Sequence, residues 1–411
     1  MIGRLQPETI VLLSPHQIMY ADYFHISPGQ DARGDFGQFR ARRTSMQVSY
    51  DTEFVRELCE AAEAAGLPAG TLGEREKKLD HGTMVPLYFV NQRWTEYRLV
   101  RIGLSGLPLS AHYRLGQCIR AAAQSLGRNT VVIASGDLSH KLKEDGPYGY
   151  QKEGPAYDAR IMDVMGRGAF GELLAFSEDF CEKAAECGHR SFTILAGAFD
   201  KTDVEARQLS YEGPFGVGYG VCTYLPRGND GTRNFLEQYE EKERAAYLAR
   251  REREDPYVRL ARYTIETFTG TGNVPEMPEG LPEELYQSRA GAFVSLKEDG
   301  RLRGCIGTIR AVRGSLAEEI MHNAVSACSE DSRFSPVEAW EVERLTISVD
   351  VLGEMEKISS PEELDVTRYG VIVTRGGRRG LLLPNLEGVD TVEQQIAIAK
   401  QKAGIKDHES V

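Results

Sequence analysis

The chain has 411 residues, of which 41% are hydrophobic and 27% charged, and its formal net charge is -12. Because single domains usually run to about 100–200 residues, this length predicts two domains, each with its own hydrophobic core. The acidic balance, without a basic cluster along a helix, argues against nucleic acid as a partner. Seven cysteines without a CxxC pair disfavour a disulfide framework. No apolar run is long enough for a signal core or a bilayer span. We therefore expect a cytoplasmic protein with no membrane partner.

The first half repeats one pattern, in which a short apolar run ends in small or polar residues and an amphipathic helix comes later. The runs at 9–13, 99–102 and 130–134 are typical of buried strands in a largely parallel sheet. One intervening helix is predicted to start at Asp51 and to stop at Gly66, and another to end at Gly127. An α/β domain follows, in which ligands gather at the carboxyl ends of the strands.

A dense cluster of turn formers at 226–231 predicts the end of the first domain, over residues 1–226. Mixed charges then predict a solvated connecting helix within 227–254. Asp255-Pro256 has the form of a helix start and opens a second domain, over residues 255–411. Strict alternation at 345–351 and a hairpin around Arg378-Arg379 predict an α+β class for it.

Four residues of the first domain combine suitable chemistry with a context that presents it: His16, His81, His140 and Glu186. Taken singly, each is weak evidence, because a lone histidine is more often structural and a glutamate usually lies on the surface. Together they indicate a metal site at a strand-end cleft. Of the other histidines, we expect His112 on the surface and weigh His189 as a residue at the mouth of the cleft.

Four motifs occur jointly: Ser14-Pro15-His16, the stretch 79–87 around Asp80-His81-Gly82, Gly136-Asp137-Leu138-Ser139-His140, and Glu186-Cys187-Gly188. In order and spacing they resemble the LigB/Memo class III extradiol dioxygenase family over residues 7–226. The resemblance implies a ferrous ion held by His16 and Glu186, with open positions for a catechol and dioxygen. It makes His140 the acid/base for the catechol and His81 a hydrogen-bond donor behind it. Asp137, like Asp80, either orients an imidazole or loop or simply forms a turn.

Two departures from the family pattern bear on the metal. Family members carry their first metal-binding histidine in a Pro-His-Pro-like segment ahead of the Ser-Pro-His strand, and this sequence begins after that point. We therefore expect an N-terminally incomplete domain that binds metal weakly. In the Memo branch a cysteine replaces the carboxylate ligand, and Cys187 keeps that alternative open.

The second half contains Leu302-Arg303-Gly304-Cys305-Ile306-Gly307-Thr308, together with Asp255-Pro256-Tyr257-Val258 and Asp331-Ser332-Arg333-Phe334. These strings resemble the AMME-syndrome candidate protein family over residues 255–411. The neighbouring glycines would let a ligand approach the Cys305 sulfur, which makes Cys305 a catalytic candidate, and a Cys-His pair with His322 is conceivable. The simpler interpretation is a small buried cysteine in a glycine-rich strand.

The leading functional expectation is a non-haem, divalent-metal-dependent extradiol dioxygenase-like protein that acts on a catechol-type aromatic and carries an AMME domain. The first alternative is a Memo-like module that binds a metal, a cofactor or a peptide without turnover. The second is an accessory protein that works with a radical-SAM partner, as in the bacterial systems that combine these domains. Function depends on the site, so fold resemblance alone does not choose among them.

Overall fold

The computed structural model describes residues 1–73, 78–298, 300–386, 388–406 and 408–409. Two compact units emerge from the contacts within the chain. The first consists of Met1–Asp255, Lys297–Leu302 and Glu338–Thr346, and the second of Pro256–Leu296, Arg303–Val337 and Ile347–Val411. None of the helices in these described ranges combines the length and the apolar character needed to span a bilayer.

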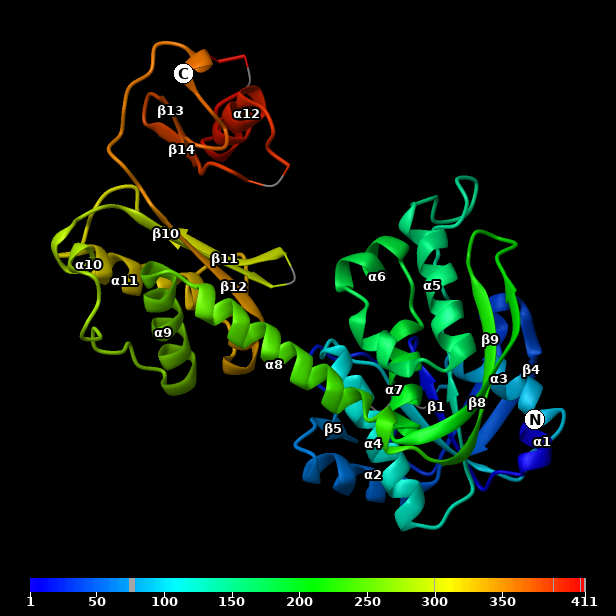
Figure 1. Cartoon of the computed structure of the whole chain (residues 1–411). Helices are drawn as coiled ribbons and strands as arrows, with labels where there is room; N and C mark the ends of the chain where they lie inside the picture. The colour runs from blue at the N-terminus through cyan, green and yellow to red at the C-terminus, as the bar shows by residue number, and fades with distance from the viewer. Residues whose placement is uncertain (74–77, 299, 387, 407, 410–411) are drawn as a thin grey trace. The chain divides into compact units, whose positions relative to one another are not determined.

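A three-stranded parallel sheet forms the centre of the first unit (Figure 1). The strand order is β6-β1-β7, with β1 at Thr9–Ser14, β6 at Arg98–Gly103 and β7 at Thr130–Ala134. Val11 of β1 lies opposite Val100 of β6 and Val132 of β7. The three predicted strands and their parallel arrangement are confirmed. β1 is buried along its whole length, as expected of a central parallel strand that reads as a continuous apolar run.

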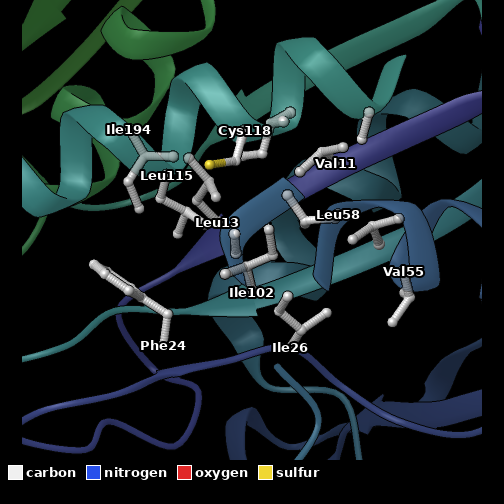
Figure 2. Close-up of a cluster of buried hydrophobic side chains, with 14 of the residues drawn as sticks. Val11, Leu13, Phe24, Ile26, Val55, Leu58, Ile102, Leu115, Cys118 and Ile194 are labelled. Carbon is white, nitrogen blue, oxygen red and sulfur yellow. The ribbon is translucent and has the colours of Figure 1, made fainter. Parts of the chain in front are cut away.

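Side chains of β1 alternate between two apolar clusters, because successive residues of a strand point to opposite faces. Val11 and Leu13 pack with residues of α2 (Thr52–Ala64) and α4 (Leu109–Ser125), as Figure 2 shows. Ile10 and Leu12 pack on the other face with residues of α3 (His81–Asn91). Asp51 caps α2 by accepting a hydrogen bond from the backbone N–H of Phe54 at 3.2 Å, so the predicted helix start is confirmed.

Shorter elements surround this centre. An antiparallel hairpin pairs β3 (Asp31–Phe36) with β4 (Ala41–Ser49), a second hairpin pairs β8 (Thr202–Glu212) with β9 (Tyr219–Asn229), and β2 (Phe24–His25) pairs with β5 (Ala69–Gly70). The remaining helices of this part are α1 (Ile2–Leu5), α5 (Glu153–Arg167), α6 (Glu178–Ala184) and α7 (His189–Ala198). A third apolar cluster forms around α5 and α7.

The predicted connecting segment, 227–254, begins inside the first unit. Its first residues complete β9, and helix α8 (Phe235–Arg253) follows. Leu236 is buried in the third cluster and Tyr239 packs against it, whereas most of the later residues of α8 are exposed. The start of α8 therefore packs as part of the first unit, because its two large side chains reach that core. A separate connecting helix between independently folding domains stays a prediction.

The second unit is α+β, as predicted. Most residues of the sheet β11-β10-β12 belong to this unit, with β10 at Ala292–Glu298, β11 at Arg301–Gly307 and β12 at Leu345–Val351. Helices α9 (Pro256–Thr271) and α11 (Leu316–Ser329) pack on each other, and α10 (Glu283–Gln287) is short. Helix α12 (Val392–Lys402) packs on a hairpin formed by β13 (Val371–Arg375) and β14 (Arg378–Leu382). Helix α9 begins at Pro256, and β12 alternates buried Leu345 and Ile347 with exposed Thr346 and Ser348. Both features confirm the sequence pattern.

Candidate functional site

Three chain segments present the candidate side chains at the carboxyl edge of the parallel sheet. His16 lies in the turn after β1, Asp137 and His140 follow β7, and His81 is the first residue of α3. The imidazole rings of His16 and His81 are 3.9 Å apart, although 65 residues separate them in the chain. The start of α3 is linked to the end of β1 by the hydrogen bond between Ser14 and Asp80, which brings the two rings together.

Asp80 joins the end of β1 to the start of α3. Its carboxylate accepts hydrogen bonds from the Ser14 hydroxyl at 2.6 Å and from the Thr83 backbone N–H at 2.9 Å, so it caps α3. The fully buried Arg101 guanidinium lies 3.6 Å from the same carboxylate. This network sets where His16 and His81 face each other. Asp80 therefore positions an imidazole pair, as one of its two sequence interpretations proposed.

His16 is suited to bind or accept a proton at neutral pH. Partial burial and the neighbouring His81 lower the pKa of His16 below its usual value, while Asp80 and Asp137 oppose that shift. A neutral imidazole keeps a free lone pair, which is what either a metal or a phenolic proton requires.

Three potential donor atoms converge beside this pair. The side chains of Asp137, His140 and Cys187 offer an oxygen, a nitrogen and a sulfur that all lie within 4.8 Å of one another. His140 Nε2 is 3.5 Å from Asp137 Oδ2, and the Asp137 backbone N–H donates to Cys187 Sγ at 3.2 Å. Burial raises the pKa of Cys187 to about 12, so its thiol keeps a proton until a cation displaces it.

Two glycines allow the loops that carry these donors to touch. A Cβ built on Gly136 would lie 2.3 Å from the Gly188 Cα, and Gly136 has a φ of +155°. The backbone N–H of Gly188 in turn donates to the Asp137 carbonyl at 3.0 Å. A side chain at Gly136 would force the β7 loop away from the loop that carries Cys187, which explains why both motifs contain glycine.

Further contacts hold the β7 loop in place. The Ser139 backbone N–H donates to Asp158 at 2.8 Å, the Ser139 hydroxyl donates to the Ala184 carbonyl at 2.8 Å, and the ring of His140 stacks on Tyr148 with centroids 5.0 Å apart. The donor-bearing loop is thus fixed by hydrogen bonds at its middle and by a ring at its end.

Glu186, predicted as a metal ligand, does not belong to this donor group. Its carboxylate accepts a hydrogen bond from the His189 backbone N–H at 2.6 Å and lines a separate cavity of about 110 Å³ with Phe176, Cys181 and Arg190. Burial raises the pKa of Glu186 to about 6. Adjacent side chains in a loop point in different directions, and here Cys187 faces Asp137 and His140. The ligand pair His16–Glu186 stays a prediction that this arrangement does not favour.

Of two other histidines, His112 was expected on the surface, which is wrong, and His189 lines the cavity beside Glu186. His112 is buried, with Nδ1 3.0 Å from the Pro108 carbonyl oxygen and Nε2 accepting from the Ser105 backbone N–H at 3.5 Å. His189 is also buried, with Nδ1 3.1 Å from the Tyr157 hydroxyl and Nε2 3.0 Å from the Leu173 carbonyl oxygen. Both rings use both nitrogens within the protein, so His112 is a core residue, and His189 meets the cavity with a side chain that is already bonded.

In the second unit, Cys305 is half-buried and accepts a hydrogen bond from the Ser295 hydroxyl at 3.2 Å. Asp331 accepts from the Cys305 backbone N–H at 2.9 Å, and its hydrogen bonds with Arg333 hold the pKa of Asp331 well below its usual range. The neighbouring Gly304 faces α11, where a Cβ would lie 2.2 Å from the Ala327 carbonyl oxygen. Since strand residues alternate, Cys305 points to the face opposite α11.

That geometry separates Cys305 from His322, because His322 lies exposed on α11. The conceivable Cys-His pair is therefore wrong. The glycine beside Cys305 serves the packing of the strand on the helix, whereas Cys305 itself is half-buried rather than buried. Cys305 as a catalytic residue stays a prediction.

None of the three converging donors belongs to the predicted ligand pair, His16 and Glu186. Asp137 and His140 were predicted in other roles, and Cys187 was weighed only as an alternative to Glu186. The signal for it was the adjacent Gly188, which permits the close approach of the Asp137 loop.

Comparison with known proteins agrees with this division of the chain. Residues 1–222 match the family model described as the catalytic LigB subunit of aromatic ring-opening dioxygenase, and residues 258–411 match the AMMECR1 model. Protein CA_C1420 of Clostridium acetobutylicum is 41% identical over 98% of this chain and 87% of its own length. A protein of Thermotoga maritima is 52% identical over 155 residues, which are 38% of this chain and 89% of that protein.

Two solved structures are also similar to parts of the chain. The uncharacterised protein PH0010 of Pyrococcus horikoshii is 35% identical with a TM-score of 0.35, covering 37% of this chain and 79% of that one. The uncharacterised protein JW3007 of Escherichia coli is 16% identical with a TM-score of 0.37, covering 55% of this chain and 89% of that one. On the strength of the family models and the full-length relative, the chain belongs to the LigB family of aromatic ring-opening dioxygenase subunits, and an AMMECR1 region follows its LigB region.

Proposed function

We propose that this protein binds a divalent first-row metal, iron foremost, at Asp137, His140 and Cys187, and that it opens the ring of a catechol-type aromatic. The observation that carries the proposal is the convergence of three different donor atoms within 4.8 Å at the carboxyl edge of the sheet. LigB proteins are generally metal-dependent, and the chain belongs to that family.

The donor geometry fits a small cation. Two donors at about 2.1 Å from a tetrahedral metal lie about 3.4 Å apart, and His140 Nε2 and Asp137 Oδ2 are separated by 3.5 Å. Imidazole, carboxylate and thiolate together suit iron, zinc or copper better than magnesium or calcium. When bound, an iron ion would supply the electron transfer and the open positions that a catechol and dioxygen need.

Two assignments of roles compete for the neighbouring residues. In the first, Asp137, His140 and Cys187 hold the metal, and His16 takes up a phenolic proton with His81 beside it. In the second, which follows from the family motifs, His16 and Glu186 hold the metal, His140 takes up the proton, and His81 and Asp137 orient the other groups. The donor distances and the hydrogen bond from His189 to Glu186 support the first.

Anaerobic titration with ferrous ion tests these roles. We expect Cys187→Ala to weaken binding by about 100-fold or more, since even outer residues of metal sites contribute 10- to 100-fold, and we expect Glu186→Gln to bind as the unchanged protein does. Cys222→Ala, at another half-buried free cysteine, is the matched control. Tight binding by Cys187→Ala together with loss in Glu186→Gln would select the second assignment, and equal binding by every variant would refute a metal site here.

Turnover is tested separately with catechols and the iron-loaded protein, by following the yellow ring-opened product. A general acid/base group contributes about 100- to 10,000-fold in rate, so in the first assignment His16→Gln should retain iron and lose most activity. In the second assignment that behaviour belongs to His140→Gln.

A second candidate function is metal binding without ring opening, and the presence of Cys187 among the donors favours it. A thiolate is the ligand that occupies the carboxylate's place in the Memo branch, where ring cleavage is not the accepted role. Iron bound at the predicted residues, with no product from any catechol offered, would support this candidate over the dioxygenase.

A further inference from the structure

The helix that begins with His81 carries apolar side chains on its exposed face as well as on its buried face. Met84, Leu87 and Val90 of α3 are buried in the core, as an α/β helix requires. Val85 and Tyr88, however, are each 45% exposed, and Phe89 is 64% exposed. Residues 82–91 of α3 contain no charged side chain. A helix that is apolar all round is normally buried all round, so this outer face is suited to contact another molecule.

The tip of the β3–β4 hairpin extends the same apolar surface. Phe36 and Phe39 have ring centroids 6.4 Å apart, Phe36 and Tyr88 6.5 Å, and Tyr88 and Phe89 5.4 Å. Phe39 is 56% exposed and packs edge-on against His81 at 5.5 Å. The aromatic surface formed by Phe36, Phe39, Val85, Tyr88 and Phe89 therefore starts beside the candidate metal site and runs outward along α3.

A basic rim borders this surface. Arg40, Arg42 and Arg43 follow Phe39 directly, all three are exposed, and residues 36–50 contain no acidic side chain. The hairpin tip therefore carries a local positive charge in a chain whose net charge is -12.

We propose that the aromatic surface and its arginine rim bind an acidic segment of a partner protein that also carries apolar side chains, an interaction that goes beyond the proposed metal chemistry. Charge decides between this occupant and larger polyanions. At physiological ionic strength charges interact over about 8 Å, so a short segment feels mainly the local arginines. A nucleic acid or an anionic membrane covers a wide area and meets the acidic remainder of the chain as well. The apolar side chains of the segment would contact Phe39 and Phe89, and its carboxylates the arginines.

A short fluorescein-labelled peptide of alternating glutamate and phenylalanine is the probe, and its fluorescence anisotropy with the whole chain is the readout. Binding should weaken as salt rises. We expect about tenfold weaker binding with the combined Arg40→Gln, Arg42→Gln and Arg43→Gln variant, and a similar loss with Phe89→Ser. Arg56→Gln on α2 and Phe215→Ser between β8 and β9 replace equally exposed side chains elsewhere and should bind as the unchanged protein does.

Two peptide controls separate the contributions, one with every glutamate replaced by glutamine and one with every phenylalanine replaced by serine, and both should bind weakly. Cys187→Ala should leave peptide binding intact, so failure of the metal proposal and failure of this one are distinguishable. Equal binding by all surface variants would overturn the proposal. So would binding of phosphatidylserine vesicles or DNA in preference to the peptide, or self-association of the chain that Phe89→Ser abolishes.

Discussion

The LigB region and the AMMECR1 region each place a half-buried cysteine next to a glycine, yet the two cysteines have different surroundings. Cys187 meets Asp137 and His140, which arrive from another loop of the same sheet edge. Cys305 meets the Ser295 hydroxyl of the neighbouring strand, and its backbone is held by Asp331. The same local pattern therefore produces a donor group in one region and a packed strand in the other.

The segment that packs against a glycine, and not the glycine alone, decides what the close approach brings together. Gly136 and Gly188 bring two loops with reactive side chains into contact, whereas Gly304 brings a strand against the α11 backbone. A small residue permits close approach in both cases, but only topology decides what approaches. In a parallel sheet, loops from several strands meet at one edge, which favours convergence of functional groups.

The largest expected effect comes from removing the buried support under the LigB site. Arg101→Met leaves Asp80 without its guanidinium and also removes hydrogen bonds to the Ser27 hydroxyl and the Lys78 carbonyl. Breaking a buried ion pair typically costs about 3–5 kcal/mol in the free energy of unfolding. Chemical denaturation measures it, with the exposed Arg98→Met on the same strand as control. A loss no larger than that of the control would mean that Asp80 is held by Ser14 and Thr83 alone.

Adding one methyl group at each glycine sharpens the contrast directly. Gly136→Ala and Gly304→Ala should each lower the free energy of unfolding by about 1–3 kcal/mol through overpacking, but only Gly136→Ala should also weaken ferrous binding. Gly231→Ala, where a Cβ meets open space, is the control for both. Equal ferrous affinity in the two variants would show that the close approach of the two loops does not contribute to metal binding.

His112, which is buried away from the candidate site, should make the stability of the fold depend on pH. Burial lowers the pKa of His112 to about 3, while in the unfolded chain it is about 6.5. Between these values only the unfolded chain binds the proton, so folding stability should fall as pH drops, by about 1.4 kcal/mol per pH unit for this one group. His112→Gln should reduce the slope of unfolding free energy against pH by that amount relative to the unchanged protein. An unchanged slope in His112→Gln would assign the acid sensitivity to other groups.

The smallest effect is expected at Cys305. Cys305→Ala removes a contact with the Ser295 hydroxyl and little else, so the free energy of unfolding should change by about 1 kcal/mol or less. Ferrous affinity should not change, in contrast to Cys187→Ala. A marked loss of iron binding in Cys305→Ala would show that Cys305, like Cys187, contributes to metal binding.

Much of the fold could be read from local pattern. The three buried strands, the cap at Asp51, the helix start at Pro256 and the alternation of β12 follow from period and capping chemistry, which act within a few residues. The burial of His112 could not be predicted in this way, because its ring packs edge-on against Phe24, a residue far away in the chain.

By itself, the sequence determined which residues could form a site and at which strand ends they lie, because apolar runs and the small residues that follow them are local signals. Only the tertiary structure decided that Cys187 rather than Glu186 faces Asp137 and His140, and that Cys305 points away from His322. The physical reason is that neighbouring residues in a loop or strand differ in direction by a large angle, and packing between segments far apart in the chain selects which of them faces the site.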